Sequence, residues 1–141
     1  MNELSDNQYV VFEIADGKYA IKISDVYEII KMKKITVIHN SKPFLEGVIN
    51  LRGKIVPIVN LHKRLEIENY TLTKTTRVII LKSRDEMVGV IVDKVNQVTG
   101  FSDIQPPPEA VAGIDGNYFD GLGISGESVI GILKIEKVLY E

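Results

Sequence analysis

The sequence predicts a mostly β fold built from small barrels. Valine and isoleucine dominate its apolar residues, and their branched Cβ atoms favour strands. Short apolar runs form four candidate hairpins at fairly even spacing, which is typical of small barrels. No long amphipathic helix is present to cover a parallel sheet, and a chain of 141 residues is expected to form one compact unit.

The first hairpin is predicted by alternating apolar runs at Tyr9–Ile14 and Lys18–Ile23. Asp16-Gly17 lies between them, and Asp-Gly accommodates the positive φ angles of a type I′ turn. Ser24 is a good N-cap, and the carboxylate of Asp25 follows in the first turn. These residues predict a short helix over 25–30.

The second hairpin is predicted at Gly47–Leu51 and Lys54–Asn60, with its turn at Arg52-Gly53. Both arms are almost entirely apolar, which indicates burial on both faces. Pro57 cannot donate a ladder hydrogen bond, so the second arm is expected at a sheet edge or bulge there. Residues 61–65 are expected to form one helical turn.

The remaining elements follow the same pattern of apolar runs and polar turns. The sequence predicts a third hairpin, a proline-rich extended loop, a last strand pair and a C-terminal helix. Their ranges are 77–81 and 87–95 for the hairpin, 105–108 for the loop, 119–124 and 129–133 for the strands, and 135–140 for the helix.

The domain organisation is expected to be simple. Residues 1–8 are polar and predict a flexible N-terminus, and residues 9–141 predict a single domain of two barrel subdomains. The polar, threonine-rich stretch at residues 66–76 is the best candidate for the internal boundary between them.

Composition argues against several classes of function. The net charge of −2 provides no basic face for nucleic acid, and no apolar run approaches the roughly 20 residues that span a bilayer. The first residues lack a basic and apolar leader, and the chain has no cysteine for disulfides, thiolate metal sites or nucleophiles. A cytoplasmic protein without direct membrane insertion is expected.

Residues 121–126 match the pattern G-x-G-x-x-G of dinucleotide-binding loops. That site requires a helix after the glycines, whereas the residues that follow have a strand pattern. We therefore interpret the motif as a glycine-rich strand and turn against which another backbone packs closely, and we expect no cofactor.

The ionisable residues do not assemble a catalytic or metal site in the sequence. His39 and His62 are far apart and are expected on the surface or in loops. Asp93 follows an apolar strand and is expected to cap a strand-end turn, with no second ionisable group at a telling spacing beside it.

Arg52 is the most distinctive polar candidate. The predicted turn displays it at a hairpin tip, where its planar guanidinium can pair with a carboxylate or stack on a ring. A solvated turn residue is an equally good interpretation. From the residues alone we predict a β-rich binding module, with a small-molecule-binding or enzymatic small β-barrel as one alternative and a structural or nucleic-acid-binding barrel as another.

One long stretch, Phe44–Leu61, carries the sequence FLEGVINLRGKIVPIVNL, which resembles the signature of CheW-type chemotaxis coupling proteins. Other segments agree in order over residues 9–140, including Phe12–Ile23, Val88–Asp93 and Leu122-Gly123. The resemblance implies two packed five-stranded SH3-like β-barrel subdomains with short helices.

The resemblance also implies a function without catalysis. Such a protein is a scaffold that connects the regulatory domain of the histidine kinase CheA to the cytoplasmic tip of methyl-accepting chemoreceptors in receptor arrays. The implied kinase-binding residues are Val26, Glu28 and Gly47. The implied receptor-binding residues are Arg52, Val78, Gly89, Val95 and Val98. Many relatives carry an aromatic residue after the proline segment, where this chain has Ala110.

Overall fold

The five-stranded sheet has the strand order β3-β6-β7-β5-β4 in this computed structural model, which describes residues 7–39, 42–67 and 72–140. Its pairs are antiparallel except for β5 and β7, which run parallel. The strands are β3 (Val26–Lys31), β4 (Leu45–Leu51), β5 (Lys54–Asn60), β6 (Arg77–Ser83) and β7 (Glu86–Val92).

The chain beyond β3 closes this sheet into a barrel. Thr36 and Val48 of β4 exchange two backbone hydrogen bonds, at 2.8 and 2.9 Å. The continuation of one edge strand is thereby joined to the other edge strand, which leaves neither edge open at that point.

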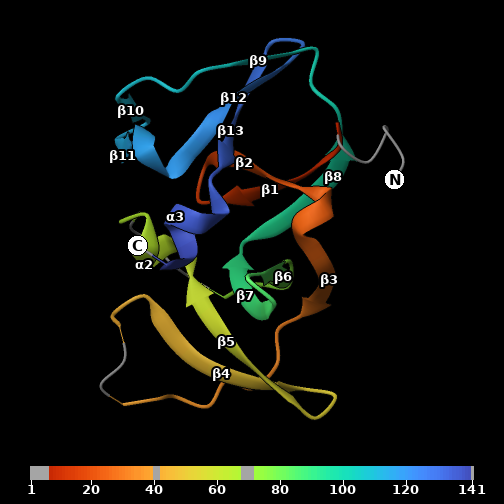
Figure 1. Cartoon of the computed structure of the whole chain (residues 1–141), viewed down its shortest axis with the longest axis vertical. Coiled ribbons are helices and arrows are strands. Elements are labelled where there is room, and N and C mark those ends of the chain that lie inside the picture. Colours follow the sequence, from red (N-terminus) through yellow and green to blue (C-terminus); the bar gives the residue numbers. More distant parts are fainter. Residues whose placement is uncertain (1–6, 40–41, 68–71, 141) are drawn as a thin grey trace.

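The second sheet has six strands in the order β8-β1-β2-β13-β12-β9 (Figure 1). They are β1 (Tyr9–Ile14), β2 (Gly17–Lys22), β8 (Lys94–Thr99), β9 (Asp103–Gln105), β12 (Phe119–Ser125) and β13 (Ser128–Leu133). The two edge strands, β8 and β9, are joined by residues 100–102 alone, so the sheet must curl to bring its edges together. The six-stranded sheet thus has one strand more than the five that the resemblance implied for each subdomain.

Short elements complete the described chain. They are η1 (Ile23–Asp25), α2 (Leu61–Arg64), β10 (Ala110–Val111), β11 (Ile114–Asp115), η2 (Gly116–Tyr118) and α3 (Ile135–Tyr140). Figure 1 shows α3 lying between the two sheets, beside α2. The mostly β fold of two barrel-like sheets is therefore confirmed, as are the helical turn after β5 and the C-terminal helix.

Two predicted elements are wrong. The helix predicted over residues 25–30 is strand β3, and Ser24 lies in η1 instead of capping a helix. The predicted arm 87–95 ends at Val92, and after Asp93 the chain enters β8 of the other sheet. By contrast, Pro57 behaves as expected, because pairing of β5 with β7 begins only at Ile58 and leaves that side of Pro57 open.

The internal boundary is also corrected. Residues 66–76 connect α2 to β6, and both β5 and β6 belong to the five-stranded sheet. The sheets divide instead at η1 and at Asp93, because β1 and β2 join the later strands of the six-stranded sheet. The predicted flexible N-terminus, residues 1–8, lies outside the described residues up to position 6.

The glycine motif at residues 121–126 is confirmed as a strand and turn, since β12 and β13 pair antiparallel on either side of it. A Cβ added at Gly121 would lie 2.8 Å from the carbonyl oxygen of Gln105 in β9. The missing side chain therefore permits the close backbone approach that was predicted.

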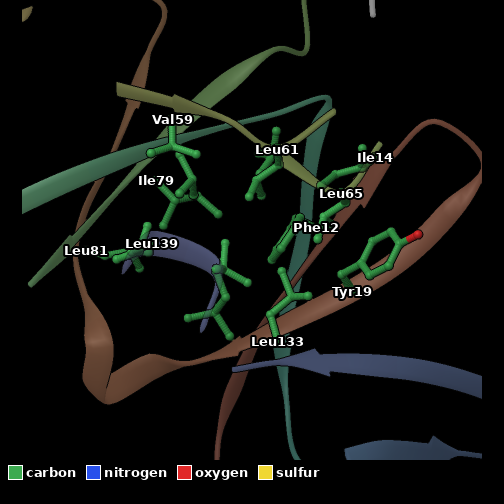
Figure 2. Packing of buried hydrophobic residues seen from close by; sticks show 14 of the residues in the cluster. Phe12, Ile14, Tyr19, Val59, Leu61, Leu65, Ile79, Leu81, Leu133 and Leu139 are labelled. Atoms are coloured by element: carbon green, nitrogen blue, oxygen red, sulfur yellow. The ribbon is translucent and has the colours of Figure 1, made fainter. Parts of the chain in front are cut away.

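The main hydrophobic core lies between the two sheets (Figure 2). The six-stranded sheet contributes Phe12, Ile14, Tyr19 and Leu133, while α3 contributes Leu139. The five-stranded sheet contributes Val59, Ile79 and Leu81, and α2 with the residue that follows it contributes Leu61 and Leu65. A smaller core fills the five-stranded barrel itself, with Ile49, Val56, Ile58, Val78, Ile80 and Ile91 among its members.

Candidate functional site

Glu28 and Arg52, which are 24 residues apart in the sequence, form an ion pair on the surface of the five-stranded barrel. Both guanidinium nitrogens donate to the Glu28 carboxylate, Nη1 to Oε2 at 3.2 Å and Nη2 to Oε1. Such a two-pronged bond matches the planar fork of arginine to the carboxylate plane. Figure 1 shows β3 and the β4–β5 turn on the same side of the molecule, which makes the contact possible.

Local backbone geometry positions both partners. Arg52 occupies the turn with φ of 49°, a left-handed conformation, and Gly53 follows it with φ of 89°. On β3, the pairing register with β6 shifts between Val26 and Glu28, so a bulge at Tyr27 re-aims the neighbouring side chains. Tyr27 lies near Arg52 and adds a smaller contribution to the rise in its pKa.

The ion pair changes the electrostatics of both groups while leaving them accessible. The hydrogen bond from Arg52 is the main reason that the pKa of Glu28 lies below its ordinary value. The same bond raises the pKa of Arg52. The side chains are 30% and 64% exposed, so a partner protein can reach either of them without unfolding the barrel. We call Tyr27, Glu28 and Arg52 the ion-pair site.

The other residues implied for kinase binding are less accessible. Val26 is half-buried and packs against the main core. Gly47 is buried, with φ of 146°, and a Cβ at this position would overlap the carbonyl oxygen of Thr36. A side chain at Gly47 is therefore excluded by the close approach of β4 to Thr36 that closes the barrel.

The residues implied for receptor binding divide into a buried and an exposed group. Val78 is fully buried, and a Cβ at Gly89 would lie 2.6 Å from the Ile58 side chain, so both face the core of the barrel. Val95 is half-buried and Val98 is 48% exposed, and both lie on β8, the edge strand of the six-stranded sheet.

A hollow of about 230 Å³ lies where the two sheets meet, and Val95 forms part of it. Ile29 of β3 lines it as well, together with Thr75, Arg77 and Lys94. We call it the junction hollow. Sequence reasoning missed Ile29 because residues 25–30 were expected to be helical, and it missed Lys94 because residues 87–95 were expected to be one strand. Nothing in the sequence of the predicted strand 77–81 singled out Arg77. The run Val-Tyr-Glu-Ile-Ile, rich in β-branched and aromatic residues, is the signal that favours a strand instead.

His62 and Asp93 form a second unexpected pair. His62 is buried in α2, so the prediction that it lies on the surface or in a loop is wrong. Its Nε2 lies 2.9 Å from Oδ1 of Asp93, so Asp93 also has an ionisable neighbour that the sequence did not reveal. Asp93 also accepts a hydrogen bond from the backbone of Ala15 at 2.6 Å, and its carbonyl accepts one from Thr75 at 2.7 Å. The pair ties three segments together at the point where the chain passes between the sheets. The predicted role of Asp93 in holding a turn fits this geometry.

The described residues include no group of three or more histidine, aspartate or glutamate side chains that could hold a metal ion. Within the same residues, no helix combines the length and the apolar character needed to cross a membrane.

Comparison with known proteins decides the family. The family model for the CheW-like domain matches residues 8–141. The chain belongs to the CheW-like family. The chemotaxis protein CheW of Treponema pallidum is 34% identical over 93% of this CheW-like chain and 81% of its own length. The chemotaxis protein CheW of Bacillus subtilis is 41% identical over 72% of this chain and 67% of its own.

A solved structure agrees with this assignment. The scaffolding protein TtCheW from Thermoanaerobacter tengcongensis is 36% identical and superposes with a TM-score of 0.88. The match covers 96% of this CheW-like chain and 89% of that protein. The fold, with its two sheets and their shared core, is therefore that of a CheW scaffold.

Proposed function

We propose that this chain is a non-catalytic adaptor that couples methyl-accepting chemoreceptors to the histidine kinase CheA. It acts in the cytoplasm, within receptor arrays at the inner face of the membrane. Similarity over nearly the whole chain to proteins named for chemotaxis, and to one described as a scaffolding protein, supports this proposal.

The observation that carries the proposal is the ion pair itself. Glu28 is the proposed kinase contact and Arg52 the proposed receptor contact, and each holds the other in place. A receptor carboxylate that engages Arg52 competes with Glu28 for the guanidinium, and the freed Glu28 then presents a different charge pattern to the kinase. One polar pair thus links two binding surfaces without chemical catalysis.

The buried members of the predicted contact sets act indirectly in this proposal. Val78 and Gly89 shape the barrel wall beneath the receptor-binding surface, and Gly47 keeps the barrel closed beneath the kinase-binding surface. Direct contacts come from Glu28, Arg52, Val95 and Val98, whose side chains are at least partly exposed.

A small-molecule or enzymatic function finds less support in the geometry. A hollow of about 450 Å³ is bordered by Pro107, Pro108, Glu109, Asp115, Gly116 and Asn117. Its lining includes two carboxylates but no imidazole, thiol, hydroxyl or cationic group that could activate a substrate.

The test is a pair of calorimetric titrations, one against the regulatory domain of CheA and one against a soluble receptor-tip fragment. We expect Arg52→Ala to lower receptor-tip affinity at least tenfold, about 1.4 kcal/mol, with a much smaller change toward the kinase. Glu28→Lys should show the reverse preference. Arg84→Ala is the control, because Arg84 is also exposed and ion-paired but contacts Glu136 of α3. Wild-type protein that binds neither fragment would contradict the proposed function.

A further inference from the structure

The junction hollow has an apolar floor and a cationic rim. Ile29 is 39% exposed on β3, and Val95 faces it from β8 of the other sheet. Arg77 and Lys94 border the same hollow. Its volume of about 230 Å³ is below the roughly 300–1,000 Å³ of typical small-molecule sites, and it suits a single inserted side chain better than a ligand.

Within the described residues, no carboxylate lies within ion-pair distance of the positive charges around this hollow, although Glu13 of β1 stands opposite Lys94 in the β1–β8 ladder. Among the described residues, neither Arg77 nor Lys94 takes part in any of the ion pairs, which join Arg52 to Glu28, His62 to Asp93, Lys63 to Glu46 and Arg84 to Glu136. Nη1 of Arg77 donates hydrogen bonds to the backbone carbonyls of Lys74 and Thr76. No described residue accepts a hydrogen bond from its Nε or Nη2, so both can donate to a partner.

The strand register adds a further positive charge. Lys31 of β3 lies directly opposite Arg77 of β6, on the face that also presents Ile29. Like charges placed opposite each other across a ladder destabilise a sheet. An acidic partner that binds at this edge would neutralise the repulsion between Lys31 and Arg77. Relief of that repulsion would add to the free energy of binding.

Basic residues are also in excess in the part of the chain that forms the five-stranded barrel. Residues 26–93, which form the five-stranded barrel and its connections, contain twelve lysine and arginine residues and seven aspartate and glutamate residues. The rest of the chain contains five and twelve, respectively. The junction hollow thus lies at the border of a basic half, where long-range attraction favours an acidic partner.

We propose that Arg77 and Lys94 determine receptor specificity by forming ion pairs with carboxylates on the helical tip of the receptor. An apolar side chain of that tip fills the hollow between Ile29 and Val95. Glutamate or aspartate residues three or four positions away on the same helix face reach the two cations, because such positions are neighbours on a helix surface. This inference rests on the proposed function, since it takes the receptor tip as the occupant.

The test measures binding of the full-length protein to a soluble receptor-tip fragment at about 0.05 and about 0.5 M salt. We expect Arg77→Gln/Lys94→Gln to bind at least tenfold more weakly at low salt and to lose most of the salt dependence. Lys94→Gln alone should lose about threefold or more, and it involves an exposed side chain that leaves the backbone contacts of Arg77 intact. Affinity for the CheA regulatory domain should not change.

The matched control is Lys82→Gln, which removes the same charge from an exposed position on the same strand as Arg77. Its tip affinity should equal that of the wild type. Restored binding of Lys94→Glu to a tip fragment in which one glutamate is exchanged for lysine would identify the paired carboxylate directly. If the wild type binds the tip and the double variant binds it with the same affinity and salt dependence, this inference is overturned and the proposed function stands. Wild-type protein that fails to bind the tip would overturn both.

Discussion

Gly47 determines whether the five-stranded barrel can close. Its missing Cβ lets β4 approach Thr36, and the two backbone hydrogen bonds between Thr36 and Val48 form beside it. We expect Gly47→Ala to destabilise the protein by about 2 kcal/mol or more, since a methyl group would overlap a backbone carbonyl that cannot move freely. Urea denaturation measures the loss.

Gly53→Ala is the matched control for this substitution. Gly53 also has a positive φ, of 89°, but a Cβ there meets nothing within 4 Å. Its loss should reflect backbone strain alone and be smaller than that at Gly47. Equal losses at both positions would show that closure of the barrel does not depend on the close approach at Gly47.

Glu28 should titrate at lower pH than an ordinary glutamate. Its folded pKa lies below the usual 4.5, so its stabilising contribution is present above that value and is lost as the pH falls through the folded pKa. An NMR titration of the side-chain carboxyl carbon should show this low midpoint in the wild type and a return toward 4.5 in Arg52→Ala. An identical midpoint in both proteins would mean that the ion pair does not persist in solution.

Single residues of the candidate site were predictable, but their pairing was not. Arg52 was singled out by its place at a predicted hairpin tip, and Glu28 by the resemblance to CheW-type proteins, within residues that were expected to be helical. Their contact depends on a β-bulge at Tyr27 that shifts the register by one residue. His62 and Asp93 are separated by 31 positions and meet only because the chain changes sheets at Asp93. Periodicity describes single elements and contains no information about such distant contacts.

At the scale of elements, turn chemistry predicted the hairpins better than local propensity predicted β3. The Arg52-Gly53 turn lies where it was expected, and β1 pairs with β2 and β4 with β5. The first turn lies one residue earlier than predicted, at Ala15-Asp16, with φ of 53° at Ala15 and Gly17 already paired in β2. For residues 25–30, the capping residue and the acidic first turn favoured a helix. Pairing with β6 decided for a strand, because it gives the backbone of this β-branched and aromatic run ladder partners that an isolated helical turn could not supply.

Arg64 holds the C-terminal helix α3 against α2. Its Nε and Nη2 donate to the carbonyls of Val138 and Lys137 at 2.7 and 2.8 Å, and Nη1 donates to the Tyr118 hydroxyl at 2.9 Å. The last carbonyls of a helix have no partner within it, so these bonds act as a cap. We expect Arg64→Lys to cost about 2–3 kcal/mol in the free energy of unfolding, because an ammonium cannot reproduce the fork.

Hydrogen exchange provides the second measurement for Arg64. The amide of Val138, which donates to Lys134, should lose protection in Arg64→Lys more than amides of β6 and β7 do. Arg84→Lys is the control, since Arg84 contacts α3 through an ion pair with Glu136 and a cation–π contact 4.0 Å from the Tyr140 ring centroid. Each such contact at an exposed arginine is worth about 1 kcal/mol or less, and lysine can form both. Equal losses in the two variants would refute the capping role.

At the scale of the whole molecule, the shared core should make the two sheets unfold together. Phe12 and Leu133 of the six-stranded sheet pack in the same cluster as Ile79 and Leu81 of the five-stranded one, and Leu139 of α3 lies among them. Neither sheet can unfold without exposing the apolar core face of the other to water. The His62–Asp93 contact and the backbone bond from Ala15 to Asp93 add a polar tie across the same boundary.

We therefore expect one cooperative thermal transition in which the calorimetric and van't Hoff enthalpies agree. Leu139→Ala should lower stability by about 2–5 kcal/mol, the range for truncating a buried leucine, and should shift the single transition without splitting it. Two transitions in the wild type, or a variant in which only one sheet loses its exchange protection, would show that the sheets are independent units. A rigid connection between the sheets matters for the proposed adaptor, because receptor and kinase surfaces can influence each other only if the scaffold between them moves as one body.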